Sequence, residues 1–283
     1  MRNKAARIAV ENTWLSLVSR SDDLIHHAGG AITFTGSGPR VTTIHDLQPL
    51  DLPANFSAVK RSWLRLLLPL TVKRSSKIVV PSNFTADRCR ALLGATDDQL
   101  VVLPHGFEAE TGGSVPNAVA GRRFLLSPGI AYPHKRHGDA ISALAKLREL
   151  GVGDLALVFT GRPRKRTAAL HEQAAKAGLC DVLFLGRVPA SELAALYQAA
   201  ACAVPSEYEG FGYPLLEAMA NGCPVVTAAG ERRPRSSATL DSSCRSERPT
   251  SWPTPCNRFW TTRRPATVSL PVAVAELPIS PTP

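Results

Sequence analysis

The stretch ACAVPSEYEGFGYPLLEAMANGCPVV, residues 201–226, has the pattern of one strand–loop–helix–strand unit. Apolar residues fill its first and last segments, a glycine-rich turn follows Ser206, and the residues from Tyr213 onward are typical of a helix. Proline is favoured in the first turn of a helix, where a backbone N–H has no intrahelical partner. The stretch therefore predicts two parallel strands that are joined by a helix beginning near Tyr213.

Two carboxylates flank the glycine-rich turn. Glu209 precedes it, and Glu217 lies about one turn into the predicted helix. Gly210 and Gly212 permit close backbone approaches, and the exposed N–H groups at a helix start attract anionic groups. A carboxylate at Glu217 can accept hydrogen bonds from both hydroxyls of a ribose, as an acidic residue does in dinucleotide-binding folds. These residues alone fit equally well a helix acid that is stabilised by the helix dipole.

The same alternation of strand and helix recurs along most of the chain. Val- and Ile-rich segments predict strands at 23–27, 40–45, 77–82, 99–106, 123–129, 155–161, 181–186, 201–206 and 223–229. Helices are predicted at 59–75, 83–94, 137–150, 167–178 and 190–200. Ser82 is a plausible N-cap of the second helix, and Gly94 a plausible stop. Apolar strands that alternate with helices predict parallel sheets covered on both faces.

Residues 109–121 interrupt this alternation. They are small, polar and aperiodic, which favours a linker. We therefore predict two Rossmann-like units, residues 1–108 and residues 122–230. Ligands of such sheets bind beyond the carboxyl ends of the strands, so the loops at those ends are the places to look for function.

The composition is that of a soluble globular protein, with 44% hydrophobic and 20% charged residues. No apolar run is long enough to cross a bilayer, and the first residues lack the apolar segment of a secretory signal. The six cysteines are scattered, which favours reduced thiols in a cytoplasmic protein. The net charge of +10 suits an anionic small molecule, an anionic membrane or nucleic acid, and does not choose among them.

The sequence resembles the GT-B glycosyltransferases of family 4, the "glycosyl transferases, group 1". The glycine turn with its two glutamates resembles the signature of that family. LVFTG, DVLFLGRVPASELAALYQAAACAVPS and PGIAYPHKRH resemble its donor domain, and VTTIHDLQPLDLP, KIVVPSNFTADRC and VVLPHG its acceptor domain. The likeness spans roughly residues 20–230. It implies an α/β protein of GT-B fold, with two Rossmann-like domains whose parallel sheets face a cleft.

The resemblance implies an enzyme that moves a hexose from a nucleotide-diphosphate sugar to a glycan or a lipid-linked acceptor and retains the anomeric configuration. Mannose and glucose are the sugars that family frequency suggests. No metal or other cofactor is implied, and no nucleic acid is expected as a partner. The expected location is the cytoplasm, including the inner face of the membrane. The alternative is a basic, non-enzymatic binding protein on a Rossmann-like scaffold.

The resemblance also assigns roles to residues. It implies that Glu217 holds the donor ribose, that Glu209 contacts the donor sugar, and that Lys135 neutralises the diphosphate; a solvated lysine beside a turn is the alternative for Lys135. His45 ends a buried strand, where the family often places a residue near the reacting sugar, and a capped strand end is the alternative. No metal ligands are implied. The other expected donor-binding residues are Arg136, Gly161, Gly210, Phe211, Gly212 and Tyr213.

One position departs from the family pattern. Many members carry an arginine five residues before the lysine, as a second clamp on the phosphates. This chain has Ile130 there. Arg136 and Arg162 are the candidates to replace the missing cation.

The basic and apolar stretch KRSWLRLLLPLTVKR, residues 60–74, allows two interpretations. It could lie against a membrane that carries a lipid acceptor. Packing of its apolar face on the sheet is the favoured alternative, because Pro69 interrupts the stretch.

Both ends of the chain differ from the family pattern. The first strands of the N-terminal half are expected to be missing, because the segment TIHD already arrives at residue 43. Residues 231–283 hold eight arginines and nine of the 23 prolines without strand–helix alternation, which predicts a disordered, non-native tail. A shifted reading frame can yield a family-like strand and helix from residue 237, so we predict a frameshift near residue 230. We expect such a fragment to be weakly active or inactive.

Overall fold

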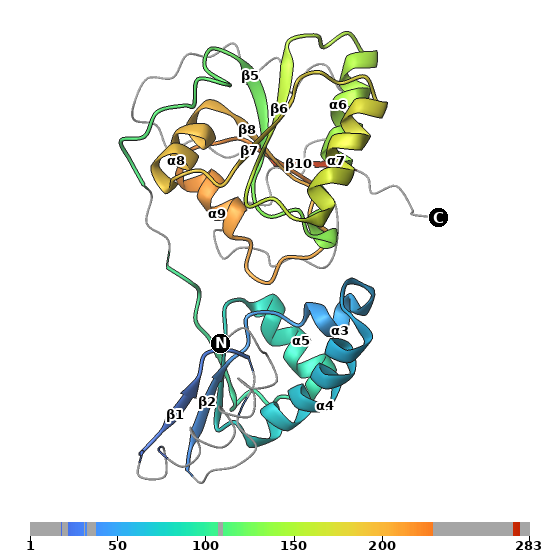
Figure 1. Ribbon diagram of the computed structural model, residues 1–283. Helices are drawn as coiled ribbons and strands as arrows, with labels where there is room; N and C mark the ends of the chain where they lie inside the picture. Colours follow the sequence, from blue (N-terminus) through green and yellow to red (C-terminus); the bar gives the residue numbers. More distant parts are fainter. Residues whose placement is uncertain are drawn as a thin grey trace. The chain divides into compact units, whose positions relative to one another are not determined.

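The computed structural model describes residues 18, 22–30, 32, 38–106, 110–228 and 274–277. The chain forms two compact units, each with a parallel sheet and helices (Figure 1). The first is built mainly from residues up to Gly106, and the second mainly from the residues that follow. The predicted α/β class with parallel sheets is confirmed.

The first unit has a four-stranded sheet in the order β1-β2-β3-β4, and every neighbouring pair is parallel. Its strands are β1 (Ile25–His27), β2 (Arg40–Thr43), β3 (Lys77–Val80) and β4 (Leu100–Val102). Each falls within a segment that was predicted as a strand. Each strand thus lies beside the next one along the chain, which is the usual outcome of short connections between consecutive elements.

Helices cover one side of this sheet in Figure 1. They are the short α3 (Gln48–Asp51), a 3₁₀ turn (Pro53–Asn55), α4 (Ala58–Arg74) and α5 (Asn83–Leu93). The Ser82 hydroxyl accepts a hydrogen bond from the Thr85 N–H, and Gly94 ends α5 in the left-handed conformation. The predicted cap and stop of α5 are thus confirmed. The helices and strands share a core that includes Ile44, Leu68, Val72, Ile78, Val80 and Cys89.

The second unit has a six-stranded parallel sheet in the order β10-β9-β8-β5-β6-β7. Its strands are β5 (Arg123–Ser127), β6 (Leu155–Thr160), β7 (Val182–Gly186), β8 (Ala201–Val204), β9 (Val225–Ala228) and β10 (Val274–Leu277). Between them lie η4 (Pro133–Lys135), α6 (His137–Glu149), α7 (Lys165–Lys176), α8 (Ala190–Ala199) and α9 (Tyr213–Ala220). The strand order reverses between β5 and β8, which is where ligands of doubly wound sheets bind.

Helices cover both faces of the second sheet, α6 and α7 on one side and α8 and α9 on the other (Figure 1). The strand β6, which lies between β5 and β7, shows this most clearly, because all six of its residues are buried. Ala156 and Val158 pack with Leu196 and Ala218 from α8 and α9, while the alternate residues of the strand pack with α6 and α7. Burial on both faces explains why the strand segments are continuously apolar.

Two segments differ from the expectations. Val119 lies in the predicted linker, yet only 1% of it is exposed, and it packs in the core of the second unit. Val274–Leu277 lie in the predicted disordered tail, yet they form β10 in parallel pairing with β9. The other residues of 231–283 lie outside the described part of the chain, as do most residues before Asp22. The expectations for those residues remain predictions.

Candidate functional site

The loop between β8 and α9 is built from the stretch that opened the sequence analysis. β8 is buried throughout its four residues and fixes the start of the loop. The loop ends at Gly212, which caps α9 with a positive φ of 90°. Few residues other than glycine adopt this conformation easily. The helix begins at Tyr213 with proline in its first turn, as predicted, and the N–H groups of Leu215 and Leu216 donate to the Gly212 carbonyl oxygen at 2.9 and 3.2 Å.

Glu217 lies one turn into α9 and is half-buried. Its Oε2 accepts a hydrogen bond of 2.7 Å from the hydroxyl of Tyr197, which belongs to the neighbouring helix α8. Burial raises the pKa of the Glu217 carboxyl above its usual value of 4.5, and the Tyr197 hydrogen bond and the Lys135 charge act in the opposite direction. The carboxylate is therefore partly desolvated and is held by its neighbours.

Lys135 ends the 3₁₀ turn η4, in the connection between β5 and α6. Its ammonium group is close enough to Glu217 for its charge to lower the pKa of that carboxyl. These two residues are 82 positions apart in the sequence, and the parallel pairing of β5 with β8 at the centre of the sheet brings the connections that follow these strands together. A cation and a carboxylate that can accept hydrogen bonds thus lie together beyond the carboxyl ends of these strands.

Arg136 forms ion pairs within the second unit. Its Nε donates to Asp139 Oδ2 at 2.6 Å, and its Nη1 lies 3.5 Å from Glu207 Oε2. The Glu207 N–H also donates to the His134 carbonyl oxygen at 2.9 Å. The two contacts of Glu207 join the segment after β5 to the loop after β8. The resemblance implied a donor-binding role for Arg136, which stays a prediction; in this structure its side chain also joins the two segments.

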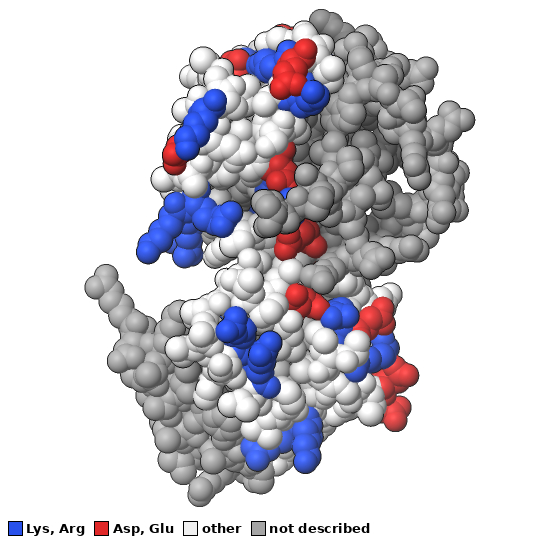
Figure 2. Space-filling model, turned by 90° about the vertical axis from the view of Figure 1, so that its right-hand side faces the viewer, with Lys and Arg blue, Asp and Glu red and all other residues white. Residues whose placement is uncertain are grey.

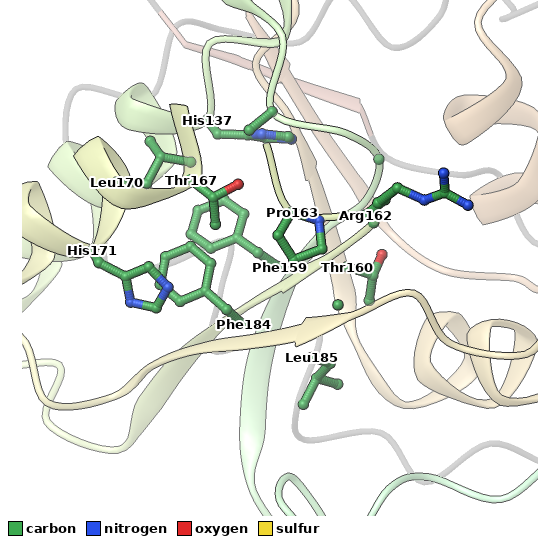
Figure 3. Close-up of a pocket in the computed structure, with 14 residues that line it drawn as sticks. His137, Phe159, Thr160, Arg162, Pro163, Thr167, Leu170, His171, Phe184 and Leu185 are labelled. Carbon is green, nitrogen blue, oxygen red and sulfur yellow. The ribbon is translucent and has the colours of Figure 1, made fainter. Parts of the chain in front are cut away.

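Gly161 follows β6 and lines a cavity of about 260 Å³. Its φ is +113°, and a Cβ atom there would lie 2.5 Å from the backbone of Gly129, so the loops after β5 and β6 approach closely at these glycines. Figure 3 shows the aromatic rings of Phe159, Phe184 and His171 in this cavity, with Arg162 at its edge. The His171 and Phe184 rings stack with centroids 3.8 Å apart.

The remaining predicted residues lie in two places. Glu209 is buried with 7% exposure, whereas Tyr213 at the start of α9 is 41% exposed. Gly210 and Phe211 lie between Glu209 and the cap residue Gly212. His45 belongs to the first unit, just beyond β2, where its Nε2 lies 3.1 Å from the Ala28 carbonyl oxygen. That hydrogen bond fixes the imidazole at the carboxyl end of the sheet.

Sequence reasoning missed two residues that contact the predicted ones. Tyr197 was assigned only to a helix, and Glu207 only to the loop. A tyrosine in an otherwise apolar helix face is a weak signal, because a buried Tyr hydroxyl usually finds a hydrogen-bond partner. Nothing local identifies that partner as Glu217. Within the described residues, no group of three His, Cys, Asp or Glu side chains is arranged to hold a metal ion.

Comparison with known proteins settles the family. The model of the "Glycosyl transferases group 1" matches residues 114–238, and the model of "Glycosyltransferase Family 4" matches residues 13–111. The chain is a member of the family 4, group 1 glycosyltransferases. The resemblance stated from the sequence motifs is thereby confirmed.

Curated relatives of this glycosyltransferase are longer. The O-antigen chain mannosyltransferase RfbU of Salmonella typhimurium is 26% identical over 188 residues, which cover 66% of this chain and 51% of the relative. A D-inositol 3-phosphate glycosyltransferase of Stackebrandtia nassauensis is 33% identical over 175 residues, which cover 56% of this chain and 40% of the relative. The chain spans about half the length of the curated relatives it matches.

Solved structures confirm the GT-B fold of this glycosyltransferase. Anabaena HepE, determined in complex with UDP and glucose, matches with a TM-score of 0.60 and 20% identity over 81% of this chain and 65% of that one. Sucrose-phosphate synthase of Thermosynechococcus elongatus matches with a TM-score of 0.62 and 18% identity over 81% of this chain and 63% of that one. At such identities the likeness extends to the fold alone.

Proposed function

We propose that the second unit binds a nucleotide-diphosphate sugar and that the chain serves the transfer of its hexose, with retention, to a glycan or lipid-linked acceptor. The observation that carries this proposal is that Lys135 and Glu217 follow the carboxyl ends of the two paired strands β5 and β8, with the Lys135 charge acting on the Glu217 carboxylate. A lysine and a carboxylate beyond the carboxyl ends of parallel strands have the charges needed to bind the two ends of a nucleoside diphosphate. The ribose offers hydroxyl donors to Glu217, and the phosphates offer negative charge to Lys135.

The chemistry of the transfer needs a cation at this position. The bond between the anomeric carbon and the diphosphate oxygen breaks, and negative charge accumulates on that oxygen. A fixed ammonium group and the positive end of the α9 helix dipole stabilise this charge. The acceptor hydroxyl oxygen bonds to the anomeric carbon, and its proton passes to the departing diphosphate. We assign no step to a metal ion or another cofactor.

The sugar itself is assigned by class only. RfbU is named a mannosyltransferase, and HepE was solved with UDP and glucose, which supports a hexose carried on a nucleotide. Glu209 is the residue we place beside the donor sugar, since it precedes the glycine turn of the same loop. His45 is the candidate for the acceptor side, since it lies at the carboxyl end of the first sheet.

We place the protein in the cytoplasm, with helix α4 as the candidate surface for a membrane that carries a lipid-linked acceptor. Val59 and Leu66 on α4 are 82% and 77% exposed, and the nearby Lys60 and Arg65 are exposed too. In Figure 2, which faces the helices of the first unit, several Lys and Arg side chains lie among uncharged ones. Apolar side chains flanked by cations suit an anionic bilayer surface. None of the described helices is long and apolar enough to span a bilayer.

Binding of UDP, GDP and ADP to the full chain, measured by titration calorimetry, tests the donor site. Glu217→Ala removes the acceptor of the ribose hydroxyls and should weaken the nucleotide that binds best by about 30-fold, as expected for hydrogen bonds to a charged group. Glu172→Ala is the matched control, because Glu172 is an exposed helical acid paired with Lys176 in the same unit. Equal affinity of both variants would contradict the proposed site.

The phosphate end is tested separately with Lys135→Met. This change should weaken a nucleoside diphosphate by about tenfold and leave the corresponding monophosphate less affected, because it removes a charge that faces the phosphates. Lys146→Met is the control, since Lys146 is exposed and pairs with Glu149 on α6. If Lys135→Met weakened the affinity for the monophosphate and the diphosphate equally, Lys135 would not contact the second phosphate.

A further inference from the structure

The hydrogen bond between Tyr197 and Glu217 joins two neighbouring helices at the candidate site. The Tyr197 side chain packs in the core between α8 and the sheet, and only 1% of the residue is exposed. Its hydroxyl reaches Glu217 Oε2 at 2.7 Å. The aromatic ring is thus held by packing, while the hydroxyl lies at the boundary between the core and the half-buried carboxylate.

The surroundings of Tyr197 keep its hydroxyl protonated. Burial is the main cause that raises its pKa, and the neighbouring Cys202, Glu217 and Cys223 act in the same direction. The hydroxyl is therefore a hydrogen-bond donor throughout the range in which proteins function. A permanent donor that faces one carboxylate oxygen restricts the rotation of the Glu217 side chain.

We propose that Tyr197 is a positioning residue that orients the Glu217 carboxylate for the two ribose hydroxyls of the donor. This inference rests on the proposed function, because it assumes that Glu217 binds the ribose. Tyr197 uses one lone pair of Oε2 and leaves Oε1 and the remaining lone pair of Oε2 for the ligand. An oriented carboxylate loses less conformational freedom on binding than a mobile one.

A purely structural role makes a different prediction. In that case the Glu217 carboxylate serves only to accept the hydrogen bond of the buried Tyr197 hydroxyl. Loss of the hydroxyl would then change the stability of the α8–α9 contact. Nucleotides with and without a ribose hydroxyl would then be affected alike. The two roles are separated by pairing a change in the protein with a change in the ligand.

The experiment is calorimetry of the full chain and of Tyr197→Phe with UDP and GDP and with their 2′-deoxy counterparts. Phenylalanine keeps the packed ring and removes the hydroxyl. We expect Tyr197→Phe to weaken the better ribonucleotide by about fivefold to tenfold and the deoxynucleotide by less than twofold. Cys202→Ala is the control for core packing, because Cys202 lies in the same buried cluster and should leave the ratio of ribo- to deoxynucleotide affinity unchanged.

A second readout needs no nucleotide. The Tyr197 hydrogen bond lowers the pKa of Glu217, and so does the charge of Lys135 on η4, against the larger effect of burial. In Tyr197→Phe the carboxyl signal of Glu217, followed by NMR, should therefore titrate at a higher pH than in the native chain. A midpoint that does not move would overturn the inference even if the variant binds nucleotides weakly for another reason.

The outcomes distinguish the inference from the function beneath it. If the native chain binds none of the nucleotides, or if Glu217→Ala binds as well as the native chain, the proposed function fails and the inference fails with it. If Glu217→Ala weakens binding but Tyr197→Phe affects ribo- and deoxynucleotides equally, the function stands and the positioning role is wrong. A selective loss for the ribonucleotide supports both.

Discussion

The two sheets of this protein are both parallel, yet they bury their strands to different extents. In the second unit, β6 is buried along all six residues between two layers of helices. In the first unit, β4 forms one edge, and its Val101 and Val102 are 40% and 38% exposed. The central strands of the second unit are thus fixed from both sides. The turn η4 and the helix α9, which carry Lys135 and Glu217, follow strands of this sheet.

The two cores also differ in polarity. The first unit has buried hydroxyl contacts, such as Thr42 to Ser75 at 2.8 Å, and the Ser75 hydroxyl donates to the Thr71 carbonyl oxygen at 2.7 Å. The second unit relies on two apolar clusters, one on each face of its sheet. A close-packed apolar core loses stability when a side chain is truncated and a cavity is left. A hydrogen bond between polar groups makes only a modest net contribution to the free energy of unfolding. The second unit should therefore be the more sensitive to core truncation.

The largest effect that this comparison predicts is the cost of a cavity in β6. Leu157→Ala removes a side chain with 0% exposure and should lower the free energy of unfolding by about 3 kcal/mol. Val102→Ala, at the exposed edge of the first sheet, should cost less than about 1 kcal/mol. Urea denaturation of both variants measures the difference, and equal losses would remove the contrast between the sheets.

The ionisation of Glu217 should produce a smaller, pH-dependent effect. Burial raises the pKa of this carboxyl in the folded protein, so the folded state binds its proton more tightly than the unfolded state does. Its favourable contribution to stability is present below pH 4.5 and is lost as the pH rises through the folded pKa. At pH 7, Glu217→Gln should therefore leave the chain as stable as the native chain or more stable, while nucleotide affinity falls about tenfold.

This trade-off is checked by thermal unfolding at pH 4 and pH 7, together with calorimetry at pH 7. The nucleotide's own phosphate titrates near pH 6, so affinities of the native chain and of Glu217→Gln are compared at the same pH. A variant that loses stability at pH 7 without losing affinity would show that Glu217 serves the fold and not the ligand.

The smallest effect concerns two helix ends that should not distinguish the units. Gly94 follows α5 with a φ of +68°, and Gly178 follows α7 with a φ of +66°. A Cβ atom would meet no atom within 4 Å at either position, so only the left-handed backbone opposes a side chain. Each Gly→Ala change should cost about 1 kcal/mol. Urea denaturation measures both losses in the free energy of unfolding. A markedly larger loss in one unit would show that the helix ends, and not only the cores, differ in their contribution to stability.

Most of the fold could be predicted from sequence because its signals are local. Strand segments are continuously apolar, and the ends of α5 carry their own capping residues. The linker was the weaker prediction, because Val119 is an isolated apolar residue without periodicity, and only tertiary packing shows that it is buried. Likewise, the 3₁₀ turn that carries Lys135 has no period that sequence could reveal.

The candidate site shows the same limit. The loop and its two glutamates follow from composition and spacing, and the resemblance supplied their roles. The partner of Glu217 could not be predicted, because Tyr197 lies on another helix and the contact depends on how α8 and α9 pack. The Arg136 ion pairs depend in the same way on two loops that are 71 residues apart in sequence.

The predicted frameshift near residue 230 remains a prediction. The family match ends at residue 238, and β10 shows that Val274–Leu277 pair with the sheet. The coding DNA decides the matter. A shifted frame that encodes a family-like strand and helix would support the prediction, and a shifted frame with no such segment would rule it out.

The most direct measurement is a crystal structure of the full chain with whichever of UDP, GDP and ADP binds best. The account predicts that both ribose hydroxyls donate to the Glu217 carboxylate while Tyr197 still donates to Oε2, and that Lys135 Nζ contacts the phosphates. A nucleotide bound elsewhere, for instance among the aromatic rings of the cavity beside Gly161, with Lys135 and Glu217 untouched, would contradict it.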